Sequence, residues 1–230
     1  MIDWETIILS LKLATTTTFL LLIVSIPFAW WLSRSTGWFS RIAETLSTLP
    51  LVLPPTVLGF YLLLLLGKDG PIGQLANKLG LEPLVFSFSG LVIGSMIYSL
   101  PFAVQPLVAS FKSIDKHLLE AAASLRASPL DQFISIALPL AKPGLLSAAI
   151  LTFAHTLGEF GVILMIGGNI PGETRVLSTA IYDHVEALEY TQAHWLSGIM
   201  LLGAFIILLS LQALRHKSKA KRLESGISPS

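Results

Sequence analysis

The sequence predicts an all-α integral membrane protein with about five transmembrane helices and a pair of short helices between two of them. Hydrophobic residues make up 53% of the chain and charged residues only 13%, whereas a soluble domain carries about a quarter charged residues. Apolar runs long enough to cross a bilayer recur along the chain, and no connecting segment is long enough to bury a core of its own. We therefore predict one transmembrane domain over residues 1–214, followed by a basic tail over residues 215–230.

Composition and motifs exclude several classes of function. The absence of cysteine excludes disulfides, thiolate metal sites and cysteine nucleophiles. The chain lacks the phosphate-loop pattern GxxxxGKS or GxxxxGKT, and it offers no convincing pair of catalytic carboxylates. We therefore expect a protein that is not an enzyme, with no metal site and no bound cofactor of its own.

The predicted spans are joined by short polar segments. The acidic start, MIDWETIILSLK, lacks the basic region and cleavage site of a secretory signal, so we expect the first span to be retained. We interpret residues 33–44 as a short polar loop, residues 67–83 as a glycine-rich turn region and residues 168–193 as a polar loop. The predicted spans cover residues 13–32, 45–66, 88–108, 145–167 and 194–214.

Prolines interrupt the second span. Pro50, Pro54 and Pro55 remove backbone donors within a short stretch, and a proline inside a helix kinks it at a cost of about 3 kcal/mol. At membrane depth the freed carbonyls need partners in protein or in a water-filled cavity, and broken helices of this kind often line transport routes. A packing kink is the alternative, but the adjacent Thr56 and Gly59 favour a pathway or gate.

The fourth span carries two ionisable residues, His155 and Glu159, at i and i+4 on one helix face. Such residues are costly at membrane depth and usually face protein or water. A zinc site is one hypothesis, but HTLGE is not HExxH and no third ligand is evident. A proton relay is a second. We favour a third, in which Glu159 is neutral or hydrogen-bonded near a helix end, in a turn around a gate that Gly158 and Gly161 make flexible.

The distribution of basic residues predicts the orientation of the chain, because cytoplasmic loops are enriched in lysine and arginine. With five spans, one side receives Arg34, Arg41, Lys112, Lys116, Arg126, Lys142, Arg215, Lys217, Lys219, Lys221 and Arg222. The other side receives only Lys12, Lys68, Lys78 and Arg175. We therefore expect the N-terminus outside and the tail in the cytoplasm, where contact with anionic lipid explains its charge better than nucleic acid does.

Residues 113–144 predict two short amphipathic helices on the cytoplasmic side. Asp115 is a suitable N-cap for the first, and Ser128, Pro129 and Asp131 form a cap, first-turn proline and acid for the second. The second helix is expected to end at Leu138-Pro139. The predicted apolar faces consist of Leu118, Leu119, Ala122 and Leu125, and of Phe133, Ile134 and Ala137. These faces need cover from the membrane surface or from a groove on a cytoplasmic partner.

The same segment resembles the EAA loop of permease subunits from bacterial ABC importers, whose pattern is EAA, three residues, glycine, nine residues and IxLP. The spacing is kept here, with Arg126 at the glycine position. The blocks LPLVLPPTVLG, ALPLAKPG, TLGEFG and GNIPGETR extend the resemblance to molybdate permease subunits over nearly the whole chain. The residues that this resemblance assigns to ATPase coupling are Glu120, Ala121, Ala122, Arg126, Ile136, Leu138 and Pro139.

The resemblance implies the type I ABC importer permease fold in a bacterial inner membrane. It implies a homodimer that encloses the pathway, two copies of a cytoplasmic ATPase that hold Mg-ATP and grip the EAA helices, and an external binding protein that delivers molybdate or tungstate. Pro54, Pro55, Thr56, Gly158 and Glu159 are then the candidate pathway or gate residues. Because the spans contain no lysine or arginine at mid-depth, we expect no tight anion site in this chain.

Two residues of the GNIPGETR block, Glu173 and Arg175, are candidates for contacts at the outer face. Arg175 is suited to meeting the binding protein or the anion there. Equally, it is suited to pairing with Glu173 or Glu186 as a tie within the loop.

Two other functions compete with this reading. One is the same machine carrying sulfate or another tetrahedral oxyanion. The other is a proton-coupled secondary transporter that uses His155 and Glu159 and needs no ATPase.

Overall fold

The computed structural model describes residues 4–224, apart from the side chains of residues 211 and 214–224, and this part of the chain is helical without strands. The elements are α1 (Trp4–Arg34), α2 (Trp38–Thr48), the 3-10 turn η1 (Leu49–Leu51), α3 (Pro55–Leu66), α4 (Pro71–Lys78), α5 (Phe88–Lys112), α6 (Lys116–Ser124), α7 (Pro129–Asp131), the π-helix η2 (Gln132–Ala137), α8 (Leu138–Leu140), α9 (Lys142–Gly158), α10 (Gly161–Gly167), α11 (Leu177–Glu186) and α12 (Tyr190–Glu224).

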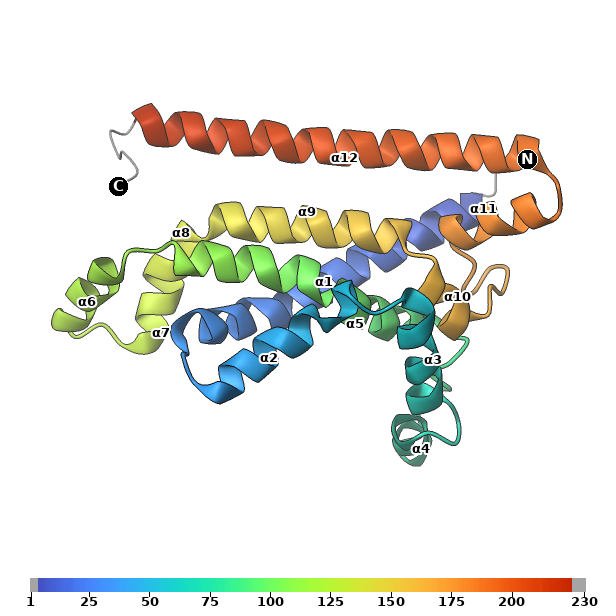
Figure 1. Ribbon diagram of the computed structural model, residues 1–230, viewed down its shortest axis with the longest axis horizontal. Helices are drawn as coiled ribbons and strands as arrows, with labels where there is room; N and C mark the ends of the chain where they lie inside the picture. The colour runs from blue at the N-terminus through green and yellow to red at the C-terminus, as the bar shows by residue number, and fades with distance from the viewer. Residues whose placement is uncertain (1–3, 225–230) are drawn as a thin grey trace.

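Helices α1, α5 and α9 pack against one another and form the centre of the molecule (Figure 1). Small residues permit this close approach: Ala29, Ala103 and Ala148 are fully buried, and a Cβ on Gly144 would lie only 2.3 Å from the Cβ of Ser110. Close contact through small residues is typical of helices in membranes, where apolar burial alone does not hold helices together. The long helix α12 lies along α9, and its apolar part is mostly exposed.

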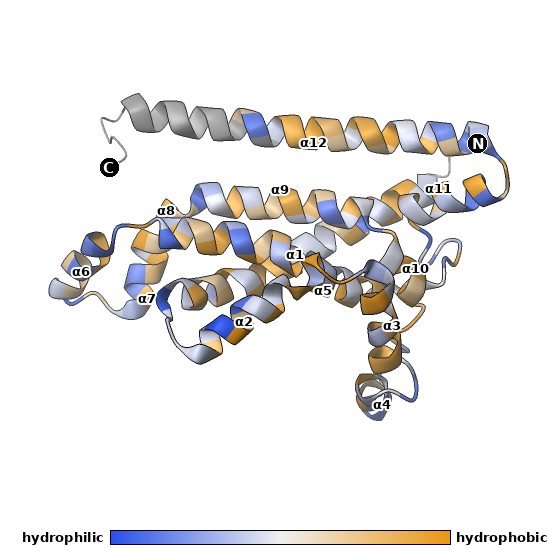
Figure 2. Cartoon of the chain, viewed as in Figure 1, coloured by the Kyte–Doolittle hydropathy of each residue, from blue (hydrophilic) through white to orange (hydrophobic). Residues whose placement is uncertain are grey.

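The prediction of an all-helical membrane fold with about five spans is confirmed. Among the described residues, the helices long and apolar enough to cross a bilayer are Trp4–Arg34, Pro55–Lys78, Phe88–Lys112 and Tyr190–Ser210. Pro129–Leu140 and Lys142–Gly158, which meet at a 69° bend, satisfy the same criteria when taken together and make a fifth span if the bent pair is counted as one. Hydrophobic residues dominate the middle of α12 and the surface of α3 (Figure 2).

The short connecting segments contain more helix than we predicted. The predicted loop over residues 33–44 is largely occupied by α2, the turn region over residues 67–83 contains α4, and the loop over residues 168–193 contains α11. Local signals start two of these helices, since Pro71 occupies the first turn of α4 and Thr179 bonds back to the backbone of Val176 at the start of α11. A search for long apolar runs overlooks such helices because each exposes one face.

The first helix begins at Trp4, well before the predicted start of the span at residue 13. Thr6, Ser10 and Leu13 are all buried, at helical spacing, so the early turns share the packed face of the later ones. Glu5 in the first turn adds a favourable interaction with the helix dipole. At the other end of the chain, the backbone of α12 runs through residues 215–224 of the predicted tail, whose side chains, with residues 225–230, lie outside the described part.

The predicted proline break in the second span is confirmed. Pro50 lies in the 3-10 turn, Pro54 has an extended backbone with ψ of 136°, and Pro55 starts α3. Within the predicted fourth span, residues 145–167, the chain forms two helices, because α9 ends at Gly158 and α10 starts at Gly161. Glu159 between them is extended, with φ of −71° and ψ of 135°.

The two breaks lie next to each other because α3 packs on α10. A Cβ on Gly161 would lie 2.6 Å from the Cβ of Pro55, and one on Gly59 would lie 2.8 Å from the Cβ of Met165. These glycines let the segments that follow the two breaks come into direct contact. Together, α3, α4, α10 and α11 form one end of the molecule, and α6 to α8 form the other (Figure 1).

We expect Gly59→Val to lower the stability of the protein, because the added carbons would force α3 away from Met165 on α10. Overpacking of this kind costs about 1–3 kcal/mol. Gly198→Val is the matched control, since nothing lies within 4 Å of a Cβ at this helical position. Thermal unfolding of both variants in one detergent is the measurement. Equal transition temperatures would contradict the close contact between α3 and α10.

Candidate functional site: coupling helices and membrane pathway

Hydrogen-bonded caps start both short helices of residues 113–144, as predicted. The Asp115 side chain accepts a bond of 2.9 Å from the backbone N–H of His117. Ser128 Oγ accepts from the backbone N–H of Asp131 at 3.1 Å, and the Asp131 carboxylate accepts from the backbone N–H of Ser128 at 3.2 Å. This reciprocal pair is a capping box, and it fixes where the chain turns between α6 and α7.

Arg126 forms the turn between the two helices in a left-handed backbone conformation, with φ of 65°. Its N–H donates to the carbonyl of Ala123 at 2.9 Å, and the N–H of Ala127 donates to that of Ala122 at 3.0 Å. A residue with a Cβ adopts this conformation at a cost of roughly 1–2 kcal/mol. Arg126, at the position where the pattern has glycine, therefore makes this turn and adds an exposed cation at its tip.

An aromatic cluster fastens the helix pair to the ends of the long helices. The Trp30 ring on α1 lies 5.4 Å from that of Phe111 on α5 and 5.5 Å from that of Phe133 on η2. Leu119 and Ala137 are buried in the same core. Because both short helices contribute to this core, a displacement of the pair must displace α1 and α5 with it.

The outer side of the pair is apolar and open. Of the predicted first face, only Leu119 is fully buried, and of the second, Ile134 points outward. We define the coupling surface as the exposed residues Leu118, Leu125, Leu130 and Ile134, of which Leu125 is 85% exposed. Glu120 lies beside this surface, with its side chain 70% exposed and 3.3 Å from His117.

We predicted that the second helix ends at Leu138-Pro139, but it does not. The chain remains helical through Leu140 and bends at Ala141 instead. Pro139 has no N–H to donate, and the turns before it are widened into a π-helix. Ile136 and Leu138 are half-buried in this stretch, while Pro139 is exposed.

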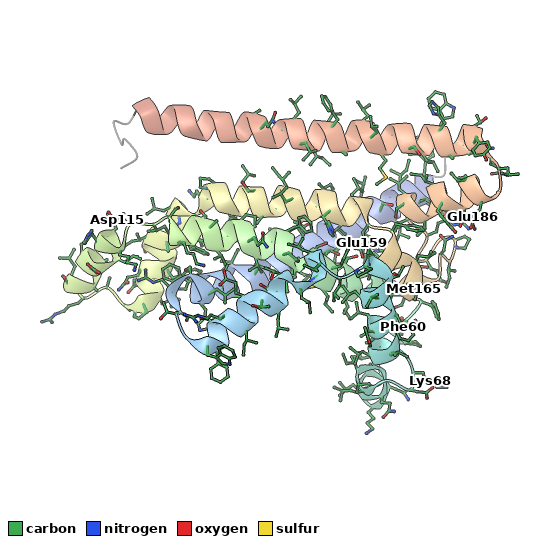
Figure 3. All side chains as sticks on the ribbon, viewed as in Figure 1. Phe60, Lys68, Asp115, Glu159, Met165 and Glu186 are labelled. Carbon is green, nitrogen blue, oxygen red and sulfur yellow. The ribbon has the colours of Figure 1, made fainter. Side chains whose placement is uncertain are left out.

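The candidate gate residues gather where the two broken helices meet. Pro54, Thr56 and Gly158 are exposed, Pro55 is half-buried, and Glu159 is only 4% exposed. Figure 3 shows Glu159 where α9 passes into α10, at the same end of the molecule as Met165 and Phe60. The prediction that Glu159 lies at a helix end is confirmed, since it caps α9.

The Glu159 carboxylate is buried without a hydrogen-bond partner among the described residues. Ser95 on α5 faces it, but its hydroxyl also lacks a bond of good geometry. The backbone carbonyl of Glu159 is engaged, because it accepts a hydrogen bond from the Ser178 hydroxyl of α11. A hydrogen bond from α11 thus stabilises the break between α9 and α10.

His155 belongs to a separate polar group and makes no hydrogen bond to Glu159. Its Nδ1 lies 2.9 Å from the Ser99 hydroxyl, which also lies 3.0 Å from the Thr156 hydroxyl. The imidazole stacks on Phe102 with a centroid distance of 4.0 Å and packs against Tyr98 at 4.9 Å. Within residues 4–224 no group of three or more potential metal ligands is present.

Ser95, Ser99 and Ser178 were not among the residues expected at the site. Ser95 and Ser99 stand at i and i+4 in an apolar helix, a spacing that places two hydroxyls on one face. That spacing was a usable signal for a polar partner. Their pairing with α9 was not visible, because Ser99 and His155 are 56 residues apart.

In the GNIPGETR loop, Arg175 pairs with Asp183 at 3.0 Å and not with Glu173 or Glu186. Asn169 donates to the same carboxylate at 2.6 Å. Arg175 therefore ties the GNIPGETR loop to α11. On α11, the Tyr182 hydroxyl donates to Glu186, and this bond raises the pKa of that hydroxyl.

Glu173 lines an open groove of about 820 Å³ beside this loop. Lys12 and Glu82 also line it, and the Lys12 ammonium lies 4.7 Å from the centre of the Phe88 ring. The groove thus presents one cation and two acids at the end of the molecule opposite the coupling surface.

Related sequences cover nearly the whole chain. The molybdenum transport system permease protein ModB of Azotobacter vinelandii is 54% identical over 226 residues, which cover 98% of this chain and 97% of that protein. ModB of Escherichia coli (strain K12) is 36% identical over 185 residues, 80% of each chain. The probable sulfate transport system permease protein cysT of Helicosporidium sp. subsp. Simulium jonesii is 33% identical, over 89% of this chain and 75% of that protein.

Solved structures share the fold at low sequence identity. A chain of a bacterial alginate ABC transporter, solved with a periplasmic protein bound to an alginate pentasaccharide, superimposes with a TM-score of 0.73 at 18% identity and covers 93% of this chain and 78% of its own. A chain of the inward-facing MetNI methionine ABC transporter gives a TM-score of 0.67 at 16% identity and covers 92% and 91%.

The family model described as the binding-protein-dependent transport system inner membrane component matches residues 17–215. The match spans most of the chain and includes both broken helices and the capped helix pair. The chain belongs to this family of membrane components of binding-protein-dependent transport systems.

Proposed function

We propose that the chain is the permease subunit of an ATP-driven importer of molybdate, with tungstate as a second substrate. The observation that carries the coupling mechanism is the exposed apolar coupling surface on a helix pair whose inner side is locked into the core of α1 and α5. The observation that carries the substrate is the 54% identity to a molybdenum permease, against 33% to a probable sulfate permease.

Two copies of the chain enclose the pathway between them. In support of this, α3 exposes large apolar side chains such as Phe60 and Tyr61, and the apolar part of α12 is barely buried. These apolar faces of α3 and α12 are not covered by other parts of the same chain. Both lipid and a second copy of the chain are suited to covering them. Pro54, Pro55, Thr56, Gly158 and Glu159 line or gate the pathway where the broken helices meet.

A cytoplasmic ATPase subunit grips each helix pair. The coupling surface fills an apolar cleft of that partner, while Glu120 and Arg126 supply charged contacts at its edge. Glu120, Ala121, Ala122 and Arg126 engage the partner directly, and Ile136, Leu138 and Pro139 carry the connection into α9. Mg-ATP is held and hydrolysed by the partner, so this chain needs no catalytic site or cofactor.

The opposite end of the molecule meets the external binding protein. The groove lined by Lys12, Glu82 and Glu173 supports this role, because it lies far from the coupling surface and mixes both signs of charge. The excess of basic residues on the other side supports an inner-membrane location with the N-terminus outside and the tail in the cytoplasm.

We expect the tagged chain to copurify with an ATPase subunit, and molybdate uptake to require ATP inside proteoliposomes that contain the complex and its binding protein. Repeating the molybdate uptake measurement with an excess of sulfate shows whether sulfate competes with molybdate for transport. Uptake that proceeds without the ATPase and stops when the proton gradient is dissipated would instead support the secondary transporter that uses His155 and Glu159.

Glu120→Lys is expected to lower molybdate uptake about ten-fold or more, because it reverses a charge at the edge of the partner cleft. Membrane insertion should be unchanged, since the exposed contact with His117 contributes little to stability. Glu189→Lys is the matched control, because Glu189 is also exposed and paired with a histidine, His184, at the other end of the molecule. Normal uptake by Glu120→Lys at equal membrane abundance would count against its role.

Leu125→Asp tests the apolar part of the coupling surface. Leu125 is 85% exposed in the chain itself, so the change should leave the fold intact but place a carboxylate in an apolar cleft, at a cost of several kcal/mol. Copurification of the ATPase should therefore be lost, as measured by gel filtration of the tagged complex. Retention of the ATPase at wild-type stoichiometry would show that Leu125 lies outside the interface.

A further inference from the structure

Ser99, His155 and Thr156 form a hydrogen-bonded chain between α5 and α9. Ser99 Oγ lies 2.9 Å from His155 Nδ1 and 3.0 Å from Thr156 Oγ1. Ser99 and Thr156 are 0% and 2% exposed, so water does not serve them as a partner. Each hydroxyl proton must therefore find its acceptor inside this group.

Only one direction of donation uses every buried proton. If Thr156 donates to Ser99 and Ser99 donates to His155 Nδ1, both hydroxyl protons are bonded. In the reverse direction, Nδ1–H donates to Ser99 and Ser99 to Thr156, which leaves the Thr156 proton without an acceptor among the described residues. A buried donor without a partner costs about 1–3 kcal/mol. The first direction therefore prevails, and it places the ring proton of neutral His155 on Nε2.

Nε2 reaches the surface of the chain. No described residue forms a hydrogen bond to Nε2. Nε2 is also absent from the fully buried polar atoms that lack a partner, so it is not fully buried. The ring is half-buried, stacks on Phe102 and packs at a tilt against Tyr98. A neutral N–H donor is thus presented in the last turn of α9, just before the break at Glu159.

We propose that His155 Nε2–H is a contact for the tetrahedral oxyanion as it crosses the pathway between two copies of the chain. This inference rests on the proposed function and identifies a residue that touches the substrate. Conduction requires contacts strong enough to replace hydration but weak enough to release the ion. A neutral donor meets both needs, whereas a buried lysine or arginine would hold a divalent anion.

Glu159 does not take this role, although it lies one turn further along the same face of α9. Both of its carboxylate oxygens are buried, so neither reaches the surface of the chain as Nε2 does. Two copies of the chain supply two such donors, one on each side of the pathway, which suits an anion that carries oxygens in every direction.

The test uses the complete complex with its binding protein in proteoliposomes, and the initial rate of molybdate uptake is the readout. His155→Phe keeps the stacking on Phe102 but removes the donor, and uptake should fall about ten- to hundred-fold, as expected for a lost hydrogen bond to a charged group. His155→Gln places an amide N–H near the position of Nε2, and uptake should return to within about three-fold of wild type. His194→Phe, an exposed histidine at the start of α12, is the matched control and should transport normally.

Ser99→Ala provides an independent variant, because it removes the bond that assigns the proton without touching the ring. In the wild-type background, Ser99→Ala should lower uptake several-fold. In the His155→Gln background, Ser99→Ala should leave uptake unchanged, since an amide N–H donor does not depend on a tautomer. Equal losses in the two backgrounds would mean that Ser99 acts on packing alone, and this would overturn the proposal.

Other outcomes also decide it. Uptake at the wild-type rate by His155→Phe overturns the inference, as does an assembled His155→Gln complex that fails to transport. Loss of complex assembly and ATP hydrolysis in both variants, measured alongside uptake, would make His155 a structural residue. If the wild-type complex moves neither molybdate nor sulfate, the proposed function fails instead.

Discussion

Backbone polar groups at membrane depth must be hydrogen-bonded or enclosed by protein. In this chain two helical stretches are interrupted, one at Pro54 and one at Glu159. The two breaks lie next to each other, so that α3, which follows Pro54, and α10, which follows Glu159, pack against one another. Glycines at positions 59 and 161 allow this, because α3 and α10 approach more closely than residues with a Cβ would permit. The arrangement leaves a pair of interrupted helices at one end of an otherwise continuous core of α1, α5 and α9.

The same core connects this end to the helix pair at the other end of the molecule. Helix α5 runs from Gly90 and Gly94, which contact α10, to Phe111, which packs against Trp30 and Phe133. Helix α5 is one helix of 25 residues, although Pro101 and Pro106 lie inside it. In the proposed mechanism, α5 is the element that would link a movement of the helix pair to the region of the breaks.

Many local features could be predicted because their causes lie within a few residues. Asp115 and Ser128 cap helices through bonds to the next turn, and the prolines around Pro54 break a helix by removing donors. Other features could not be predicted, because their partners are distant in the chain. For Arg175, a contact at the outer face and a tie to Glu173 or Glu186 were equal alternatives, but packing of α11 brings it to Asp183. Ser99 meets His155 only because α5 and α9 are neighbours.

The amino-acid sequence alone determined the class of protein, the caps of the helix pair and the first helix break, since hydropathy, capping and missing backbone donors act locally. It also carried the resemblance to importer permeases, which the family match supports. Only the tertiary structure decided that both breaks coincide and which side of the helix pair remains open. These depend on contacts between helices that are far apart in the sequence, and no local rule specifies such contacts.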